Sequence, residues 1–387
     1  MGLGQKDKTK ANSVEMMAYR FCGSPTAEQE HQLNQFIGSC RFLWNRMLAD
    51  KQAYYNATGG TLHCTPAQYK NLPGLEWLKD VDSLALANVQ LRQEAAFSRF
   101  FQKKGGYPNF KKKHCCSDSY TTNLASRGAN NIALNGNMLK LPKIKTPIKL
   151  RLHRQVKPGG VLKSVTVIRE PNGKWYFALA FEYPKVEQVS QSKPISELKH
   201  IGLDMSLPRL YVDSNGEAAD YSKPYRKLEK RIAKEQRKLS HMAKGSSNYM
   251  KQCKRIAKLH AKAKHQRNDM LHKLSFRLTE QYDVISIEDL DMAAMKQALR
   301  FSKSVSDNGW GKFVSMLTYK SNWKGKRLVK VDKWFASSKT CSKCDYKHKE
   351  LKLSDRIYVC PHCGNVMDRD HQAAINIDRE GMRMLAA

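Results

Sequence analysis

Acidic residues are scarce in this chain. Asp and Glu together number 35 against 68 Lys and Arg, so the 387 residues carry a formal net charge of +33. Lys and Arg neutralise phosphates and release counterions, and an excess of this size therefore predicts a polyanionic partner. Two other interpretations are a surface that only keeps the chain in solution, and adhesion to a negatively charged membrane surface.

Long apolar stretches are also lacking. No run of about 18 apolar residues occurs, and the Lys-rich segment from Met1 to Ser13 has no apolar core of the kind that a signal peptide carries. The apolar fraction of 41% is nevertheless sufficient for packed cores. We therefore expect several folded domains, with no membrane span and no membrane partner.

Most of the ten cysteines show no disulfide-forming pattern, which predicts a reducing cytoplasm. These six are Cys22, Cys40, Cys64, Cys115, Cys116 and Cys253. The other four form two Cys-x-x-Cys pairs, Cys341 with Cys344 and Cys360 with Cys363, and this spacing predicts a structural zinc site. A rubredoxin-like iron site, which uses the same ligands, and fortuitous disulfides are the alternatives.

The N-terminal half combines strand and helix patterns. Residues 14–22 resemble a strand, and a helix capped by Thr26 and Gln29 follows to about Asn56. A second helix is predicted over 83–102, with its buried face formed by Leu84, Ala87, Leu91, Ala95 and Phe100. Alternating segments with intervening turns over 119–185 predict a small β-barrel or sandwich, which the strand at 14–22 joins. The helical unit is then an insertion.

Two segments of the chain concentrate positive charge. Residues 105–113 form a basic loop with interleaved aromatic rings and end in Lys111, Lys112 and Lys113. Such loops can hold a nucleic-acid backbone while rings stack on bases, although an ordinary solvated loop fits equally. Residues 222–280 form a helical hairpin with 18 Lys and Arg against 4 Asp and Glu, an imbalance that favours a phosphate-facing surface.

Three acids in the C-terminal half follow a common pattern. Asp204 and Glu288 each end a short apolar strand, and Asp370 opens a helix just after the second cysteine pair. A lone Asp in such a place is more often a helix cap or a surface charge. Clustered carboxylates, however, repel one another unless a cation is present, and Mg²⁺ or Mn²⁺ on such acids cleaves phosphodiesters. We therefore interpret the set as a catalytic metal site.

At these residues the chain resembles the TnpB family, the RNA-guided nucleases of bacterial and archaeal insertion sequences, which are regarded as ancestors of small type V CRISPR effectors. The resemblance lies in Gly202-Leu-Asp204, Ser286-Ile-Glu288, Ser337-Ser-Lys-Thr-Cys341, Leu353-Ser-Asp-Arg356, Asp368-Arg-Asp370, Arg41 to Arg46, Pro108 to Lys113 and Asp307-x-Gly-Trp310. It covers nearly the full length.

The resemblance implies a multidomain α+β and α/β protein: a wedge β-barrel with an inserted helical recognition domain, then an RNase H-like RuvC nuclease domain with a zinc-ribbon insertion. The implied domains are a tail and first barrel strand (1–22), the recognition domain (23–115), the barrel (116–190), a linker (191–198), RuvC (199–336, with the basic hairpin 222–280), the zinc-binding target-strand-loading domain (337–366) and a final RuvC segment (367–387).

The family also implies roles for individual residues. Asp204, Glu288 and Asp370 would bind Mg²⁺ or Mn²⁺, and Arg356 would assist at the scissile phosphate. The expected nucleic-acid contacts are Arg41, Arg46, Lys111, Lys112, Lys113, Lys230 and Arg237. Two positions depart from the family pattern, Gln372 where Asn is usual and Asp345 where Gly is usual. The first predicts weaker activity and the second an altered zinc turn.

The implied function is RNA-guided cleavage of double-stranded DNA beside a short adjacent motif. We expect one copy of the protein to bind each guide RNA, in the cytoplasm of a prokaryote and in association with the nucleoid. A nuclease-inactive RNA-guided repressor, a small type V CRISPR effector and a DDE-type transposase are the alternatives.

Overall fold

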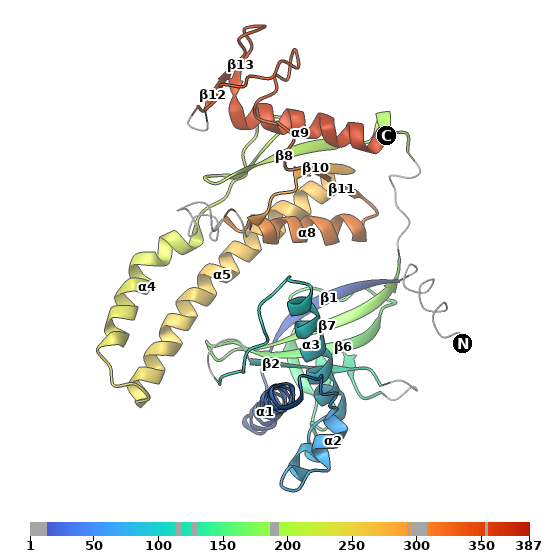
Figure 1. Ribbon diagram of the computed structural model, residues 1–387, viewed down its shortest axis with the longest axis vertical. Helices are drawn as coiled ribbons and strands as arrows, with labels where there is room; N and C mark the ends of the chain where they lie inside the picture. The colour runs from blue at the N-terminus through green and yellow to red at the C-terminus, as the bar shows by residue number, and fades with distance from the viewer. Residues whose placement is uncertain are drawn as a thin grey trace. The chain divides into compact units, whose positions relative to one another are not determined.

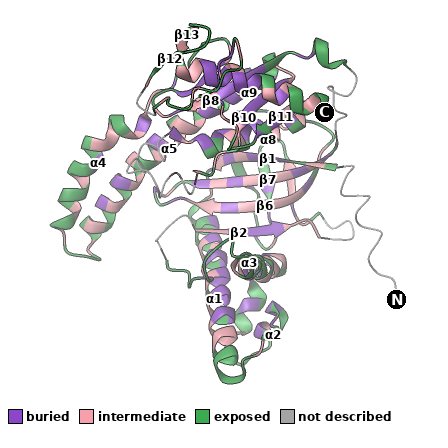
Figure 2. Ribbon diagram, turned by 45° about the horizontal axis from the view of Figure 1, so that its top comes forward, coloured by how far each residue is buried: buried purple, intermediate pink, exposed green. Residues whose placement is uncertain are grey.

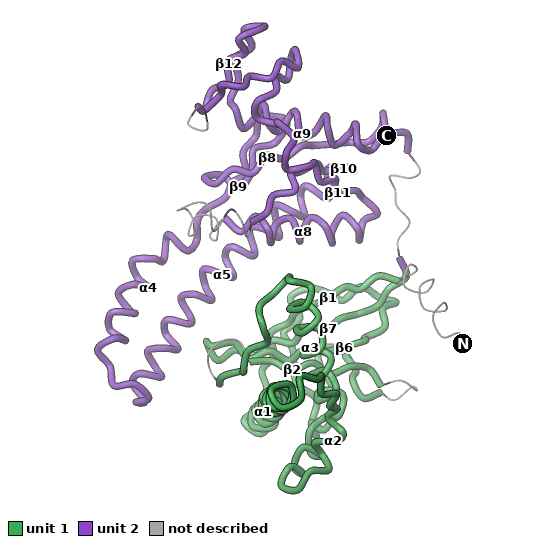
Figure 3. Tube along the Cα trace, in the orientation of Figure 1, with its two compact units in different colours: residues 1–184 green, residues 185–387 purple. Residues whose placement is uncertain are grey.

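The computed structural model describes residues 14–113, 118–125, 130–185, 193–292, 295, 308–352 and 355–387. The chain forms two compact units, Met1–Pro184 and Lys185–Ala387 (Figure 3). Several predictions lie outside the described residues: the N-terminal tail, Cys115 and Cys116, the start of the linker, and the motif positions Asp307, Leu353 and Ser354. Within the described ranges, no helix has the length and apolarity needed to cross a membrane.

The first unit is built on a seven-stranded sheet with the strand order β2-β6-β7-β1-β5-β4-β3. Strands β2, β6, β7 and β1 are labelled in Figure 1. Its strands are β1 (Val14–Gly23), β2 (Asp118–Asn123), β3 (Ala133–Asn135), β4 (Met138–Lys140), β5 (Ile148–Arg151), β6 (Val161–Arg169) and β7 (Trp175–Pro184). All the described pairings in this sheet are antiparallel. β1 pairs with β7 along its whole length, from Val14 opposite Pro184 to Gly23 opposite Trp175. The prediction that the first strand joins the later strands is therefore confirmed.

The described residues between β1 and β2 form four helical segments: α1 (Ala27–Thr58), α2 (Pro66–Lys70), the short 3₁₀ helix η2 (Glu76–Asp80) and α3 (Ser83–Phe101). α1 begins at the predicted capping box. The Thr26 hydroxyl accepts from the backbone amide of Gln29, and the Gln29 side chain accepts from the backbone amide of Thr26. It ends at Gly59, whose φ of 69° is the left-handed conformation that glycine adopts readily. One face of α1, which includes Leu33, Leu43 and Met47, is buried.

The predicted buried face of α3 is wrong. The buried residues of this helix are Ala85, Leu86, Val89 and Gln93, and the predicted Leu91 is 57% exposed. At about 100° of rotation per residue, these buried positions lie on nearly the opposite side of the helix from Leu84, Leu91 and Ala95. Gln93 takes part because its side-chain amide donates to the Trp44 carbonyl of α1 at 3.0 Å, a bond that allows a polar group in the interior.

The second unit contains a four-stranded sheet with the order β11-β10-β8-β9. Its strands are β8 (His200–Ser206), β9 (Leu210–Asp213), β10 (Val284–Glu288) and β11 (Arg327–Val331). β10 runs parallel to both β8 and β11, and β9 is antiparallel to β8. Parallel strands require long crossovers, and here helices supply them.

Helices pack against both faces of this sheet. One face packs against α5 (Ser247–Gln281) and α8 (Trp310–Trp323), in a core that includes Ile201, Leu203, Ile285 and Ile287. The other face carries α9 (Arg369–Ala386), which contacts all four strands. Figure 2 shows purple, buried segments on the helices of both layers, among pink and green ones. Because side chains alternate along a strand, Gly202 and Ser286 point toward α9.

The predicted basic hairpin consists of α4 (Pro224–Ser240) and α5. Ser246 caps the start of α5 by accepting from Tyr249, and the buried side chain of Gln252 donates to Glu235 of α4 at 2.7 Å. The outer faces of both helices are exposed (Figure 2). These faces present the Lys and Arg residues to solvent.

Candidate metal centres and nucleic-acid interface

Asp204 lies where the pairing of β8 changes partner. The parallel register with β10 ends at Leu203 opposite Ile287, and β8 then continues to Ser206 against β9. The expectation that the strand ends at Asp204 is therefore wrong by two residues. The carboxylate follows Gly202 by two positions, so it points to the α9 side of the sheet.

Glu288 is the last residue of β10, as predicted, and the next position after the parallel register with β8. It follows Ser286 by two positions and so shares the α9 side with Asp204. Its carboxylate accepts a hydrogen bond from the Ser337 hydroxyl. Burial raises the pKa of Glu288, and the bond from Ser337 partly offsets that rise.

Asp370 enters from the other layer, in the first turn of α9. Asp368 caps this helix by accepting from the backbone amides of Asp370 at 2.9 Å and His371 at 3.1 Å. The Asp370 carboxylate accepts from the Ser206 hydroxyl of β8 at 3.4 Å. The cap therefore fixes the helix start beside the strand that carries Asp204.

The three acids share one neighbourhood. Burial raises the pKa of Asp204 well above its ordinary value, and the negative charges of Glu288 and Asp370 raise it further. The positive charge of Arg369 opposes this rise. The charges of Glu288 and Asp370 thus disfavour ionisation of Asp204, and a divalent cation bound to these oxygens would offset that effect.

Two residues near the acids carried no role in the sequence prediction. The Arg369 guanidinium lies 3.9 Å from the Asp370 carboxylate, and its positive charge lowers the pKa of Asp204. Arg369 belongs to a motif recognised in the sequence, but no role was predicted for it. Ser337 was also part of a recognised motif, and only the fold reveals its contact with Glu288. The predicted Arg356 is exposed. Its backbone carbonyl accepts a hydrogen bond from the backbone amide of Arg369 at 2.9 Å, so the two arginines are neighbours in space.

The four paired cysteines converge as a zinc site requires. The sulfur atoms of Cys341 and Cys363 lie 3.7 Å apart, those of Cys344 and Cys360 lie 3.6 Å apart, and all four fall within 4.8 Å of one another. A tetrahedron with Zn–S bonds of about 2.3 Å has sulfur–sulfur edges of about 3.8 Å, whereas a disulfide measures about 2 Å. The four cysteines could therefore hold a zinc ion.

Two equivalent turns present these cysteines. In the first, the Asp345 amide donates to the Cys341 carbonyl, and in the second the Gly364 amide donates to the Cys360 carbonyl, both at 3.0 Å. The residue after each pair is left-handed, with φ of 58° at Asp345 and 69° at Gly364. The family's usual Gly at position 345 thus has a conformational reason, and Asp is one of the few other residues that tolerate this region.

Side chains of α9 form hydrogen bonds with the first residues of the cysteine module. Asn376 donates to the carbonyls of Ser337 and Thr340, both at 2.7 Å, and Arg379 donates to the Ser342 carbonyl. Gln372 is fully buried, and its side-chain oxygen accepts from Ser342 at 3.3 Å. This unusual Gln therefore contacts the cysteine module.

β12 (Ile357–Val359) and β13 (Val366–Asp368) complete the module as a two-stranded antiparallel ribbon. β13 leads directly into α9, so the ribbon and the helix that carries Asp370 form one continuous segment.

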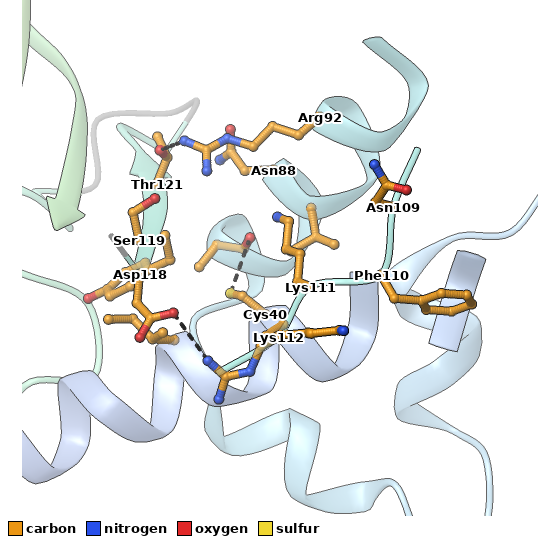
Figure 4. A pocket seen from close by; sticks show the side chains of 15 residues that line it. Cys40, Asn88, Arg92, Asn109, Phe110, Lys111, Lys112, Asp118, Ser119 and Thr121 are labelled. Carbon is orange, nitrogen blue, oxygen red and sulfur yellow. Dashed lines mark hydrogen bonds and ion pairs between the residues drawn. The ribbon is translucent and has the colours of Figure 1, made fainter. Parts of the chain in front are cut away.

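The first unit has a cavity of about 430 Å³ between α1, α3, β2 and the basic loop, and several polar side chains stand in its largely apolar wall (Figure 4). Arg92 donates to Thr121, and Arg41 pairs with Asp118 at 3.3 Å. The side chains labelled in Figure 4 are Cys40, Asn88, Arg92, Asn109, Phe110, Lys111, Lys112, Asp118, Ser119 and Thr121. Amide, hydroxyl and guanidinium groups thus converge on one space.

The other side chains predicted to contact nucleic acid differ in their contacts within the protein and in their exposure. Lys111 places its ammonium 3.9 Å from the centre of the Trp44 ring, and its backbone is bonded to Asn45 in both directions. Arg46 pairs with Asp50 one turn along α1. Lys112, Lys113, Lys230 and Arg237 are exposed.

Three family models match the chain. One described as "Probable transposase", of the IS605 OrfB type, matches residues 183–299, and one described as "Cas12f1-like, TNB domain" matches 310–377. A third, described as "Helix-turn-helix domain", matches 16–60, where this structure has β1 and the single helix α1. The fold and these matches define an insertion-sequence protein of the OrfB class.

Curated relatives specify the family. A Streptomyces pristinaespiralis protein is 32% identical over 372 residues, with 94% of this chain and 89% of that protein covered. InsQ of Escherichia coli K12 is 30% identical over 393 residues, with coverages of 96% and 94%. Both carry RNA-guided DNA endonuclease as a provisional name. The chain belongs to the TnpB family.

Among solved structures, the fold is similar to that of a Cas12f1 complex with single guide RNA and target DNA, with a TM-score of 0.57 and 13% identity. The alignment covers 91% of this chain and 83% of that chain. At this identity the likeness concerns the fold.

Proposed function

We propose that this protein is an RNA-guided DNA endonuclease that cleaves double-stranded DNA next to a short adjacent motif. The observation that carries the proposal is that the charges of Glu288 and Asp370 raise the pKa of Asp204, an effect that requires the three carboxylates to lie near one another. Nothing in packing alone favours such an arrangement, because burying like charges is costly. The provisional names of the relatives support the same activity.

Asp204, Glu288 and Asp370 would hold Mg²⁺ or Mn²⁺. When bound, such ions supply an activated water and stabilise the leaving oxygen of the phosphodiester. The chain's own contribution is to orient the ligands: Ser337 holds Glu288, and the Asp368 cap and Ser206 hold Asp370. Arg369 and Arg356 lie at facing positions, from which a guanidinium could bind the scissile phosphate.

The mixed sheet with an acidic site at the ends of its parallel strands supports an RNase H-like RuvC domain, formed by residues 199–336 and 367–387. Residues 337–366 would be its zinc-bearing insertion, with Zn²⁺ bound by the four cysteines. In the first unit, residues 23–115 would be the recognition domain and 116–190 the wedge barrel, with the first strand supplied by β1.

Guide RNA and target DNA would be held by phosphate contacts along the exposed α4–α5 hairpin and the basic loop. The cavity in Figure 4 offers Asn88, Arg92, Ser119 and Thr121 to read base edges of the adjacent motif. Base pairing with the guide would supply the remaining specificity. We place one copy of the chain on each guide, in the cytoplasm of a prokaryote near the nucleoid.

The direct test is cleavage by the purified complex. RNA that co-purifies with the chain is sequenced and supplied as the guide, and a matching target plasmid is incubated with Mg²⁺. Asp204→Ala should abolish cleavage while guided binding to the target persists. The matched control is Asp289→Ala, which alters an exposed acid next to Glu288 that pairs with Lys330 at 2.8 Å. Retained cutting by Asp204→Ala would refute the acid cluster.

The same assay separates the alternatives. A guided repressor would bind the target and leave it intact with the wild-type acids present. A DDE-type transposase would join DNA ends and would remain active after ribonuclease treatment. A small type V CRISPR effector would behave identically in the tube, and the genes beside its own would identify it.

A further inference from the structure

A second cavity in the first unit shares no residue with the one in Figure 4. It has a volume of about 790 Å³, within the range of pockets that take small organic groups. The end of α1, residues 60–65, the outer half of α3 and Tyr107 enclose it. It is formed from the aromatic, basic stretch that follows the buried part of α3.

Aromatic rings dominate the lining of this cavity, and they are not part of the core. The Phe97 ring meets Tyr107 edge-on at 5.6 Å and stacks on Phe101 at 6.4 Å, while Phe100 meets Tyr107 at 5.3 Å. Phe101 is nevertheless 74% exposed and Tyr55 is 63% exposed. Large rings left open to water beside a hollow indicate a surface that is covered by a ligand.

The charges around the rings identify the ligand class. The Lys51 ammonium lies 5.3 Å from the centre of the Phe97 ring, and Arg99, Lys103 and Lys104 are exposed on the adjoining turn. Exposed aromatic faces with cations nearby match a base with its phosphates, whereas an apolar peptide would gain nothing from the cations.

Polar groups on the wall could contact the edge of a base. The Gln90 side chain donates to the Glu94 carboxylate at 2.8 Å, and both line the cavity. A carboxylate accepts hydrogen bonds from exocyclic amino groups, and an amide offers both donor and acceptor. The cavity thus combines stacking faces, a polar edge and nearby cations.

We propose that this cavity binds an unpaired nucleobase of a single-stranded segment of guide RNA or of the displaced DNA strand. The base would stack on Phe101 and Tyr55, with its phosphate toward Lys51. A base within a duplex is already stacked on both sides, so the site selects single strands. The inference rests on the proposed nucleic-acid function and assigns a base-stacking site that the acid cluster does not require.

The test uses the whole chain and an unstructured oligonucleotide that carries 5-iodouracil for photocrosslinking or 2-aminopurine for fluorescence. Crosslinks are expected on Tyr55 and on the peptide that contains residues 97–107, and 2-aminopurine should be quenched on binding. Tyr55→Leu with Phe101→Leu should weaken the quenching interaction roughly tenfold or more, as expected for the loss of base stacking. Both residues are exposed, so the fold should survive.

The matched control is Trp77→Leu, which removes a half-exposed ring of the same helical unit outside this cavity. Crosslinks confined to other peptides, or unchanged binding in the double variant, would overturn the proposal. The proposal would also be overturned if light scattering showed a dimeric wild type and a monomeric double variant that bind the oligonucleotide equally well. The cavity would then be an interface between copies of the chain. Guided cleavage, measured in parallel, separates this failure from failure of the endonuclease proposal.

Discussion

The Ser337 hydroxyl donates a hydrogen bond to the Glu288 carboxylate, although the two residues are 49 positions apart. The carbonyl of the same serine accepts from Asn376 of α9 at 2.7 Å. One residue therefore joins the end of β10, the start of the cysteine module and the helix that carries Asp370. This arrangement makes the position of an acid depend on the module that follows it.

Ser337→Ala is expected to shift the pH dependence of cleavage. Burial raises the pKa of Glu288 and the serine bond lowers it, so removal of the bond should raise that pKa further. A larger fraction of Glu288 is then protonated at a given pH, so the acidic limb of the pH–rate profile moves to higher pH and more Mg²⁺ is needed. Ser338→Ala is the control, and an unchanged acidic limb in Ser337→Ala would contradict the role of this bond.

Asp204→Asn should stabilise the protein in Mg²⁺-free buffer while it abolishes cleavage. The folded-state pKa of Asp204 is raised, so its ionisation lowers stability as the pH rises from the unfolded-state value through the folded-state value. At neutral pH the neutral amide removes this penalty. Each kcal/mol that is relieved corresponds to about 2–4 °C in the melting temperature of a unit of this size.

The measurement is thermal unfolding of zinc-loaded protein at neutral and mildly acidic pH, with and without Mg²⁺. The difference between variant and wild type should shrink at acidic pH, where Asp204 is protonated, and when Mg²⁺ is added. A variant that melts below the wild type in Mg²⁺-free buffer at neutral pH would show that the acids are not in electrostatic conflict.

Local patterns in the sequence predicted most elements of the fold. The capping box at Thr26, the hairpin of α4 and α5 and the acid at the head of α9 depend on neighbouring residues, and all are present. The buried face of α3 was not predictable in this way. It depends on the long-range bond from Gln93 to Trp44, which an apolar stripe does not reveal.

The acids and cysteines were recognisable by motif, and their supports were not. The contact of Ser337 with Glu288 and the effect of Arg369 on Asp204 join segments that are distant in sequence. Gln372 was predicted to weaken activity, and its side-chain oxygen contacts Ser342 in the cysteine module. Its predicted effect on activity is therefore indirect.

Cys344→Ser should remove zinc and loosen the start of the cysteine module. The wild type is expected to contain one zinc ion per chain by elemental analysis, and loss of one thiolate should greatly weaken binding. Cys253→Ser changes a half-buried cysteine of α5 outside the cluster and should leave the metal content unchanged. Iron in place of zinc, or equal metal content in both variants, would contradict the assignment.

Gly202→Ala should disrupt the contact between β8 and α9. A Cβ atom at Gly202 would lie 2.2 Å from the Ala374 carbonyl oxygen and 2.6 Å from the Asp378 amide nitrogen, both backbone atoms that cannot turn aside. We expect a loss of stability of about 3 kcal/mol or more, because α9 must move away from the sheet. Asp370 moves with that helix, so Mg²⁺-dependent cleavage should fall even in the folded fraction.

The control for Gly202→Ala is Gly106→Ala, where an added Cβ meets no atom within 4 Å and the melting temperature should hardly change. Gly381→Ala provides an independent check, since its Cβ would lie 2.0 Å from the Ser286 hydroxyl oxygen on β10. If both variants at the α9 contact melt like the wild type, the close approach of this helix does not position Asp370. If they are destabilised and also require more Mg²⁺, the two glycines act by allowing α9 to bring its acid to the strand ends.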